Sequence, residues 1–329
     1  MNRRIGMTTT IPVEIVYAAG HTPVDLNNIF ITADNRESML KQAEESGFPT
    51  GVCAWIKGIY AAASRGSLDA VVSVVHGDCA NTIALGEVWR HRGTPVIEFA
   101  FPYRRDRERL AASLKRFADE LGATADDIAW WKRRLDAIRR HLVRLDEMTW
   151  KQGRVTGNEN HLWLVNSSDF YGDPDRFERE LLAFLEEAEQ RPERVDDDAL
   201  RIGVLGVPTI LDDLYDNLEQ RGARVVFNEV QRQFSMPSMA PDLVEQYMNY
   251  TYPFDLPFRS QDILAETKQR KLDGLVHYIQ SFCHRQIEDI VLREVVDVPV
   301  TTIEGDRPGP MDGRTMTRLD AFLEMLRER

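Results

Sequence analysis

The chain has 329 residues, of which 43% are hydrophobic and 29% are charged, a length that suits two domains and a composition that excludes disordered and collagen-like proteins. Its 41 Lys and Arg face 53 Asp and Glu, and the net charge of −12 argues against nucleic acid or an anionic membrane as a partner. The sequence contains no run of about 18 apolar residues and no cleavable signal peptide, so we expect a cytosolic protein without a membrane span.

Residues 1–103 alternate strand patterns with helix patterns and form the first expected α/β lobe. The apolar segment "IPVEIVYAAG" predicts a first strand that closes at Gly20. The later elements are expected to be a helix at 35–47, a buried strand at 68–79, a helix at 80–93 and a strand at 94–102. Strands separated by helices of this length indicate parallel pairing with right-handed crossovers.

Residues 104–195 change to helices rich in Arg, Lys, Asp and Glu, including a long amphipathic segment at 125–153, and we expect a helical insertion or cap. The pair Trp130 and Trp131 is expected to pack in the core of this cap rather than to stack on a cofactor. The charged segment "RPERVDDDAL" at 191–200 is expected to be a linker.

Residues 196–329 repeat the alternation and form the second expected α/β lobe. Strands are predicted at 200–208, 223–230, 273–283 and 298–306, and helices at 210–222, before Lys271, at 284–296 and at 315–329. We therefore predict two flavodoxin-like or Rossmann-like lobes with parallel sheets, plus the helical insertion. The shared outline of the two lobes indicates a duplicated architecture.

Three cysteines, Cys53, Cys79 and Cys283, occupy similar local contexts. Cys79 and Cys283 each end a predicted strand and precede a helix, at the sheet edge where open parallel sheets bind ligands. Cys53 follows a loop with Pro and Gly at the expected start of a helix. Because the N–H groups and the dipole at a helix N-terminus lower the pKa of a thiol, we expect these positions to favour a thiolate or an anionic cluster.

The residues alone leave the role of these cysteines open. Three thiols cannot all pair in disulfides within one chain, and a free cysteine is most often a small buried hydrophobic residue. Successive cysteines lie 26 and 204 residues apart without a CxxC pair, so a zinc site would need His76 or His284 to complete it. Thiolates also hold iron–sulfur clusters, and three cysteines on a four-iron cluster leave one iron open for substrate.

Other polar residues lie near the predicted strand ends. Glu14 and His21 are expected either to reach a cleft as proton-transfer groups or to make structural hydrogen bonds. His284 is expected to donate to a cluster sulfide or to cover a helix start. Asp78 is expected to be the N-cap of the helix that follows it.

The last predicted strand ends with Glu304 and Asp306, which we expect to pair with Arg314 or Arg318 rather than to move protons. The segment "GVLGVP" lacks the glycines of a dinucleotide fingerprint, and no GxxxxGK[ST] motif occurs. The chain is therefore not expected to bind ATP itself.

Six segments, in order along the chain, carry a resemblance to a known family. They are "IPVEIVYAAG", the isolated Cys53, the strand ending in "GDC" at Cys79, "LRIGVLGVP" with "RGARVV", "DGLVHYIQSFC", and "TTIEGDRPGPMDGRTMTRLDAFLEML". Together they resemble the 2-hydroxyacyl-CoA dehydratase D-component family, which also includes benzoyl-CoA reductase subunits and double-cubane cluster proteins. The resemblance extends over nearly the whole chain.

The resemblance implies two α/β lobes with a [4Fe–4S] cluster between them, ligated by Cys53, Cys79 and Cys283. It implies that a separate ATP-hydrolysing iron–sulfur activator supplies one low-potential electron, which the cluster passes to the thioester carbonyl of a CoA-thioester substrate. The ketyl radical anion so formed expels the neighbouring hydroxyl, and loss of a β-proton gives the enoyl-CoA after the electron returns. A homologous second subunit, or a second copy of the chain, is the implied partner in a dimer.

The sequence departs from the family pattern at two places. The segment "GRTMTR" stands where a Gln-containing segment before the Thr-Arg pair is more usual, and "GVP" replaces more polar versions of that turn. These departures leave the identity of the acyl group undetermined. Two alternatives to the dehydratase function also stay open. One is a low-potential reductase of the benzoyl-CoA or double-cubane type, and the other is a non-catalytic iron–sulfur electron carrier.

Overall fold

The computed structural model describes residues 2–194 and 198–329, and the chain divides into two compact units. Unit 1 comprises Met1–Arg140, Asn166–Arg179 and Phe234–Asp255. Unit 2 comprises His141–Val165, Glu180–Gln233 and Leu256–Arg329. The segment 104–195, expected as one helical insertion, is therefore shared between the two units.

Unit 1 is built on a four-stranded parallel sheet. Its strands are β1 (Arg4–Met7), β2 (Thr22–Asp25), β3 (Ala70–His76) and β4 (Val96–Ala100), in the order β2-β1-β3-β4. The central strand β3 carries Val71, Val72 and Val74, all fully buried, as expected of a parallel strand that is covered on both faces. The predictions for β3 and β4 are confirmed.

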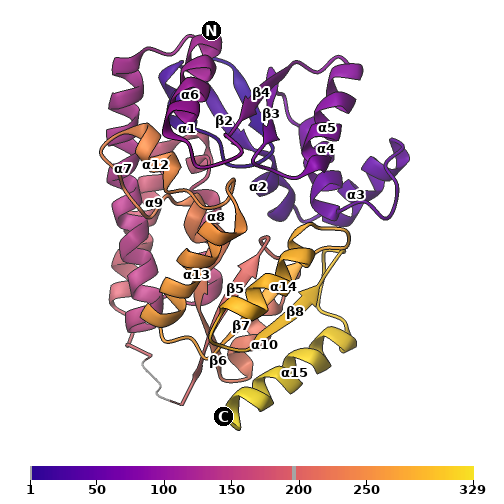
Figure 1. Ribbon diagram of the computed structural model, residues 1–329, viewed down its shortest axis with the longest axis vertical. Coiled ribbons are helices and arrows are strands. Elements are labelled where there is room, and N and C mark those ends of the chain that lie inside the picture. The colour runs from indigo at the N-terminus through magenta and orange to yellow at the C-terminus, as the bar shows by residue number, and fades with distance from the viewer. Residues whose placement is uncertain (1, 195–197) are drawn as a thin grey trace. The chain divides into compact units, whose positions relative to one another are not determined.

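Five helices join and cover these strands: α1 (Val13–Ala18), α2 (Leu26–Ile31), α3 (Arg36–Glu45), α4 (Ala54–Arg65) and α5 (Ala80–His91). α4 leads into β3, and α5 leads from β3 to β4. Because crossover helices run antiparallel to the parallel strands they connect, both helices begin at the carboxyl edge of the sheet. Figure 1 shows α4 and α5 next to each other beside β3 and β4.

Unit 2 repeats the topology of unit 1. Its strands are β5 (Leu200–Gly206), β6 (Ala223–Asn228), β7 (Gly274–Ile279) and β8 (Val300–Glu304), all parallel and in the order β6-β5-β7-β8. In each sheet the first and third strands are therefore central. The second strand is the edge strand next to the first, and the fourth is the edge strand next to the third. The prediction of two parallel α/β lobes with a shared outline is confirmed.

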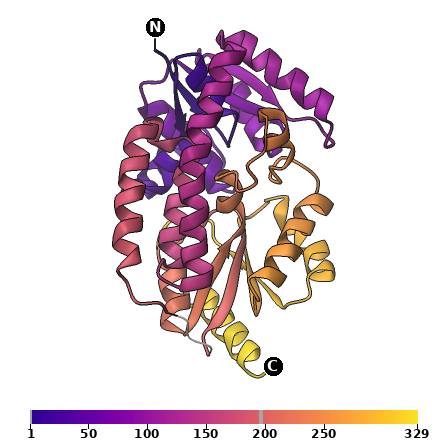
Figure 2. The same cartoon turned by 90° about the vertical axis from the view of Figure 1, so that its left-hand side faces the viewer.

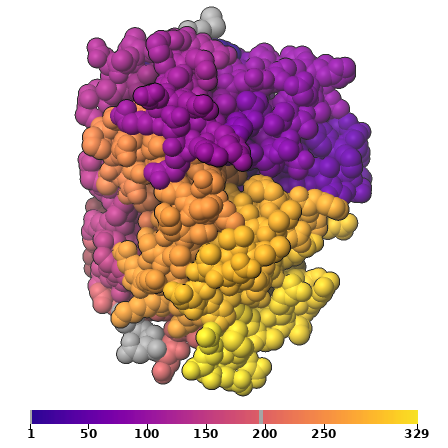
Figure 3. Space-filling view, in the orientation of Figure 1, coloured from indigo at the N-terminus to yellow at the C-terminus, as the bar shows by residue number. Residues whose placement is uncertain are grey.

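The helices that join these strands are α10 (Leu214–Gln220), α11 (Glu229–Phe234), α13 (Leu256–Gln269) and α14 (Arg285–Val295), and α15 (Gly313–Arg327) follows the last strand. Among other apolar residues, the core contains Leu205, Phe227, Ile263, Leu275 and Leu292. Figure 3 shows α15, in bright yellow, at the surface of this unit. Its inner face, which includes Phe322 and Leu326, lies so close to β7 that a side chain at Gly274 would clash with both.

The segment between β4 and β5 is helical, as predicted. It contains α6 (Arg107–Leu121), α7 (Ala125–Glu147), the π-helix η1 (Met148–Gln152), α8 (Gly157–Asn166), the 3-10 turn η2 (Phe170–Gly172) and α9 (Pro174–Glu189). Figure 2 shows the long helices of this segment in magenta and pink. Arg134 of α7 pairs with Asp175 and Glu178 of α9 at 2.6 and 2.7 Å. The linker predicted at 191–200 includes residues 195–197, which lie outside the described residues.

The first strand was predicted at the wrong place. The segment at 11–20 contains α1, and the first two strands lie on either side of it, at Arg4–Met7 and Thr22–Asp25. A short apolar run cannot be assigned to strand or helix from its periodicity. The true first strand, β1, has only four residues, too few to give a clear pattern. Tertiary contacts decide the matter, because the helix presents Glu14 to Arg139 of α7 at 2.8 Å.

The expected packing of the tryptophan pair is wrong for one of its members. Trp131 stacks on Tyr17 of α1, with ring centroids 4.7 Å apart, but Trp130 is 52% exposed.

Unit 1 also contains the helix α12 (Leu243–Met248), which lies in the segment Phe234–Asp255.

Candidate functional site

Cys79 lies at the carboxyl end of β3 and is the N-cap residue of α5. The expectation that Asp78 would be the N-cap is therefore wrong. Asp78 instead holds the turn together, because its carboxylate accepts hydrogen bonds from the backbone N–H of Cys79 and from the Thr82 hydroxyl, both at 2.8 Å. The Thr82 hydroxyl in turn lies 3.7 Å from the Cys79 Sγ atom.

The electrostatics of Cys79 differ from the expectation. Burial, and then the Asp78 carboxylate, raise the pKa of the Cys79 thiol, and its hydrogen bonds with Thr82 oppose this only in part. The prediction that the helix N-terminus would lower this pKa is therefore wrong, since desolvation and a neighbouring anion outweigh the dipole. A thiol of this kind gives up its proton when a cation or a metal binds at the sulfur.

The loop before Cys79 requires glycine and is covered by a distant segment of the same unit. Gly77 has a φ of +95°, and a Cβ atom there would lie 2.8 Å from side-chain atoms of both Phe101 and Pro253. The hydroxyl of Tyr252 donates to Asp78 at 3.3 Å. The returning segment Phe234–Asp255 thus packs on the turn that holds Cys79.

Cys53 is the N-cap residue of α4, as its loop context predicted. The loop before it is held by the buried Lys57, whose Nζ atom donates to the Thr50 carbonyl at 3.0 Å and pairs with Glu44 at 2.7 Å. Val52, next to Cys53, and Asn81, two residues after Cys79, line the same groove. The first turns of the two cysteine-capped helices therefore lie near each other within unit 1.

Cys283 lies in unit 2 at nearly the place that Cys79 has in unit 1, since it follows the third strand and directly precedes His284, the N-cap of the helix that leads to the fourth. Its N–H donates to the Gln280 carbonyl at 3.1 Å, and its carbonyl accepts from the N–H of Gln286 at 3.0 Å. Phe282 before it has a φ of +60° and is 87% exposed. A non-glycine residue in this region marks a constrained turn.

The turn at Cys283 is held by the carboxylates at the end of β8. Asp306 accepts from the backbone N–H of Ser281 at 2.7 Å, and Glu304 accepts from the Ser281 hydroxyl at 2.6 Å. The prediction that these carboxylates would pair with Arg314 or Arg318 is wrong. They join the ends of two neighbouring strands instead.

An ionic network lies at the start of α14. The buried Arg259 of α13 forms two hydrogen bonds with Glu229, at 2.8 and 2.7 Å, and one with Glu288 of α14 at 2.5 Å. Although burial opposes ionisation, Arg259 keeps the pKa of Glu229 below its usual value. Glu288 also pairs with Arg285 at 3.3 Å, so the network extends to within two residues of Cys283.

His284 is the N-cap residue of α14, and its side chain is 52% exposed. Its Nε2 atom lies 3.8 Å from a Glu288 oxygen. The pKa of His284 is lowered, first by partial burial and then by the charge of Arg285, which outweighs the attraction of Glu288.

The other two predicted proton-transfer residues make hydrogen bonds within unit 1. Glu14 is fully buried and accepts from Arg139, Gln246 and the Tyr247 hydroxyl at 2.8 to 3.0 Å, so the structure places it in a packing network. His21 precedes β2, at the amino edge of the sheet, where its Nδ1 accepts from the Arg3 N–H at 3.4 Å. The sequence analysis places both residues at the first predicted strand, but in the structure that segment contains the helix α1.

Sequence reasoning missed Tyr252, Glu229 and Arg259. Glu229 directly follows β6, so the strand-end argument that drew attention to the cysteines applied to it as well. Tyr252 and Arg259 carried no comparable signal, because their partners lie 174 and 30 residues away in the chain.

All three cysteines are free of disulfides, and Cys53 and Cys79 belong to unit 1 whereas Cys283 belongs to unit 2. Within residues 2–194 and 198–329, no three His, Cys, Asp or Glu side chains form a metal-binding group. None of the helices described combines the length and apolar composition that crossing a membrane requires.

The fold and the cysteines define a class of protein, a duplicated parallel α/β protein with cysteines outside disulfides at helix starts near the sheet edges where such folds bind ligands. The model of the family described as 2-hydroxyglutaryl-CoA dehydratase, D-component, matches residues 8–326, and the chain belongs to this family. It is therefore a dehydratase-type component, and the predicted family is confirmed. No curated protein matches the chain.

Proposed function

We propose that the chain is the iron–sulfur subunit of a 2-hydroxyacyl-CoA dehydratase, with Cys53, Cys79 and Cys283 as the ligands of a [4Fe–4S] cluster. The observation that carries the proposal is the common setting of the three thiols. Each is outside a disulfide and only partly buried. Cys53 and Cys79 are N-cap residues, and Cys283 directly precedes the N-cap His284. Cys79 and Cys283 follow corresponding strands in two sheets of the same topology.

The donor set suits such a cluster. Soft thiolates are the ligands that iron–sulfur clusters use, and three of them leave one iron of four without a protein ligand. The pKa of the Cys79 thiol is raised, and this suits a ligand that loses its proton only when metal binds. The N–H groups and the positive dipole ends at the starts of α4 and α5 would stabilise an anionic group bound there.

When bound, the cluster supplies one-electron transfer to the thioester carbonyl and a Lewis-acidic iron. The residues of the chain hold the ligands in place. Asp78 and Thr82 hold the turn of Cys79, and the contacts of Ser281 with Asp306 and Glu304 hold the turn of Cys283. Second-layer hydrogen bonds of this kind fix the orientation of metal ligands.

We assign His284 a proton-transfer role, because its half-exposed imidazole directly follows Cys283. Glu14 and His21 take no part in the proposal. Glu14 has its hydrogen bonds satisfied within the packing of unit 1, and His21 lies at the opposite edge of the sheet from the cysteines. The partners we propose are a homologous subunit or a second copy of the chain, and a separate ATP-hydrolysing activator, since the chain has no phosphate-binding loop motif.

The test is iron and sulfide analysis after anaerobic purification of the chain and of the variants Cys53→Ser, Cys79→Ser and Cys283→Ser. Each variant is expected to lose most of its iron, whereas Ser38→Ala, on the exposed face of α3, keeps it. Unchanged iron content in any cysteine variant would remove that cysteine from the site.

Turnover of a 2-hydroxyacyl-CoA with a matched activator then separates the three candidate functions. A dehydratase recovers its electron after each turnover and forms the enoyl-CoA, whereas a reductase consumes electrons with every product molecule that it forms. A carrier holds iron but binds no CoA thioester. His284→Gln is expected to slow turnover without loss of iron.

A further inference from the structure

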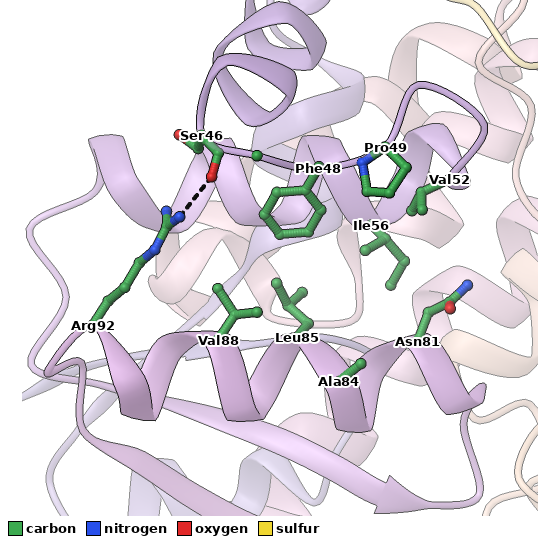
Figure 4. Close-up of a pocket in the computed structure, with 11 residues that line it drawn as sticks. Ser46, Phe48, Pro49, Val52, Ile56, Asn81, Ala84, Leu85, Val88 and Arg92 are labelled. Atoms are coloured by element: carbon green, nitrogen blue, oxygen red, sulfur yellow. Dashed lines mark hydrogen bonds between the residues drawn. The ribbon is translucent and has the colours of Figure 1, made fainter.

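A groove of about 310 Å³ lies between α5 and the segment that leads into α4. Figure 4 shows its two walls, with side chains of the loop and of α4 on one side and one face of α5 on the other. The walls are mainly apolar and include Phe48, Val52, Ile56, Ala84, Leu85 and Val88. The volume lies at the lower end of the range typical of small-molecule sites.

The groove is long and has two different ends. Its α5 wall extends from Asn81 to Arg92, about 16 Å along the helix axis at the usual rise per residue. Arg92 lies at the far end, where its guanidinium donates to the Ser46 carbonyl at 2.7 Å and to the Tyr60 hydroxyl. It thereby closes that end with donors already engaged by the protein.

The near end of the groove lies beside the two cysteine-capped helix starts of unit 1. Its lining residue Val52 directly precedes Cys53, and its lining residue Asn81 follows Cys79 by two residues. An acyl group held next to these helix starts can therefore extend its chain along α5. The walls that it would contact are hydrocarbon for most of their length.

We propose that this groove binds the acyl chain of the CoA thioester, and that it selects an aliphatic or aryl chain over a chain that ends in a carboxylate. The inference rests on the proposed dehydratase function and adds the class of acyl group. Each methylene buried in an apolar groove strengthens binding about fourfold, the equivalent of about 0.8 kcal/mol. The terminal carboxylate of a short chain would lose its hydration among the apolar side chains, because Arg92, the cation of the lining, lies at the far end of the groove.

The experiment measures dissociation constants of butyryl-, hexanoyl-, octanoyl- and glutaryl-CoA, by calorimetry, for the anaerobically purified full chain. These thioesters lack the 2-hydroxyl group, so they bind without turnover. Affinity is expected to rise about fourfold per methylene along the straight-chain series. Glutaryl-CoA is expected to bind no more tightly than butyryl-CoA, and Arg92→Gln should leave that comparison unchanged.

Substitutions in α5 test where the acyl chain binds. Val88→Trp fills the far half of the groove and is expected to weaken octanoyl-CoA binding roughly tenfold or more while sparing butyryl-CoA. Ala84→Trp, closer to the thiols, is expected to weaken both. Glu87→Trp, on the same helix but outside the groove, is the matched control and should bind the series as the unmodified chain does.

The outcomes separate this inference from the function on which it rests. Chain-length dependence that survives Val88→Trp overturns the groove assignment and leaves the dehydratase proposal standing. Tighter binding of glutaryl-CoA that Arg92→Gln abolishes overturns the apolar preference. A chain that holds its iron but binds no CoA thioester removes both the inference and the dehydratase function.

Discussion

The carboxylate of Asp78 accepts a hydrogen bond from the backbone N–H of Cys79 at 2.8 Å. The N–H at a helix N-cap has no partner within its own helix, so a carboxylate one residue earlier both satisfies it and fixes the turn. The same carboxylate binds Thr82 and Tyr252, so one side chain joins the end of β3, the first turn of α5 and the returning segment of unit 1.

Asp78→Ala is expected to loosen this turn. It removes the acceptor of three hydrogen bonds and leaves the Cys79 N–H without its carboxylate partner, at a cost of about 1–3 kcal/mol in the free energy of unfolding. Urea unfolding of the full chain measures the loss, and iron analysis should show reduced retention. Asp78→Asn keeps one acceptor oxygen and is expected to recover part of both. Iron retention equal to that of the unmodified chain would contradict a role in holding Cys79.

Gly77→Ala is expected to destabilise the same turn by a different route. Residues other than glycine are strained at a φ of +95°, and the added Cβ would lie 2.8 Å from the side chains of Phe101 and Pro253. The cost is expected to be about 1–3 kcal/mol or more, measured as a lower urea midpoint. Gly93→Ala has a similar φ of +80° but open space around its Cβ, so it serves as a control for backbone strain alone. If Gly77→Ala and Gly93→Ala destabilise the protein equally, the contact of the added Cβ with Phe101 and Pro253 contributes nothing to the loss.

Arg259→Met is expected to be among the most destabilising single changes in unit 2. It leaves the buried Glu229 without its cation, and breaking a buried pair in this way typically costs about 3–5 kcal/mol. Chemical unfolding measures the effect. The double variant Arg259→Met with Glu229→Gln removes both charges and should recover a substantial part of the loss. A double variant as unstable as the sum of the single variants would show that the two charges are not coupled.

Asp169 is expected to make a contribution to stability that falls as the pH rises between about 4 and 7. Burial and the nearby Asp25 carboxylate raise the pKa of Asp169 to about 7, so the folded state keeps a proton that the unfolded state loses near pH 4. The stabilisation is complete below the unfolded pKa and is lost as the pH rises through the folded pKa, at a slope of up to about 1.4 kcal/mol per pH unit.

Asp169→Asn should remove this contribution and make the pH dependence of stability more positive between about 4 and 7, because the side chain no longer titrates. Urea unfolding at a series of pH values gives the measurement, and Asp34→Asn, at an exposed site, is the control and should keep the slope. A variant with the full slope of the unmodified chain would assign the pH dependence to other groups.

The local pattern of the sequence was enough for much of the fold. Buried parallel strands such as β3 and β7 are mostly apolar, and helices such as α5 and α14 follow them after a short turn, so residues close in sequence carry the signal. The position of Cys79 and Cys283 at equivalent strand ends followed from the same pattern. The start of the chain failed, because β1 is short and the apolar residues of α1 suit either structure.

The family, the alternation of strands and helices, and the setting of the three thiols were determined by the sequence itself, since each depends on neighbours within one or two elements. The tertiary structure alone decided which charges surround those thiols. Asp78 and burial raise the pKa of Cys79, Tyr252 returns from 174 residues away to bind Asp78, and Glu14 turns inward to Arg139. Desolvation and ion pairing depend on what is packed against a side chain, and that packing is made by segments distant in the chain.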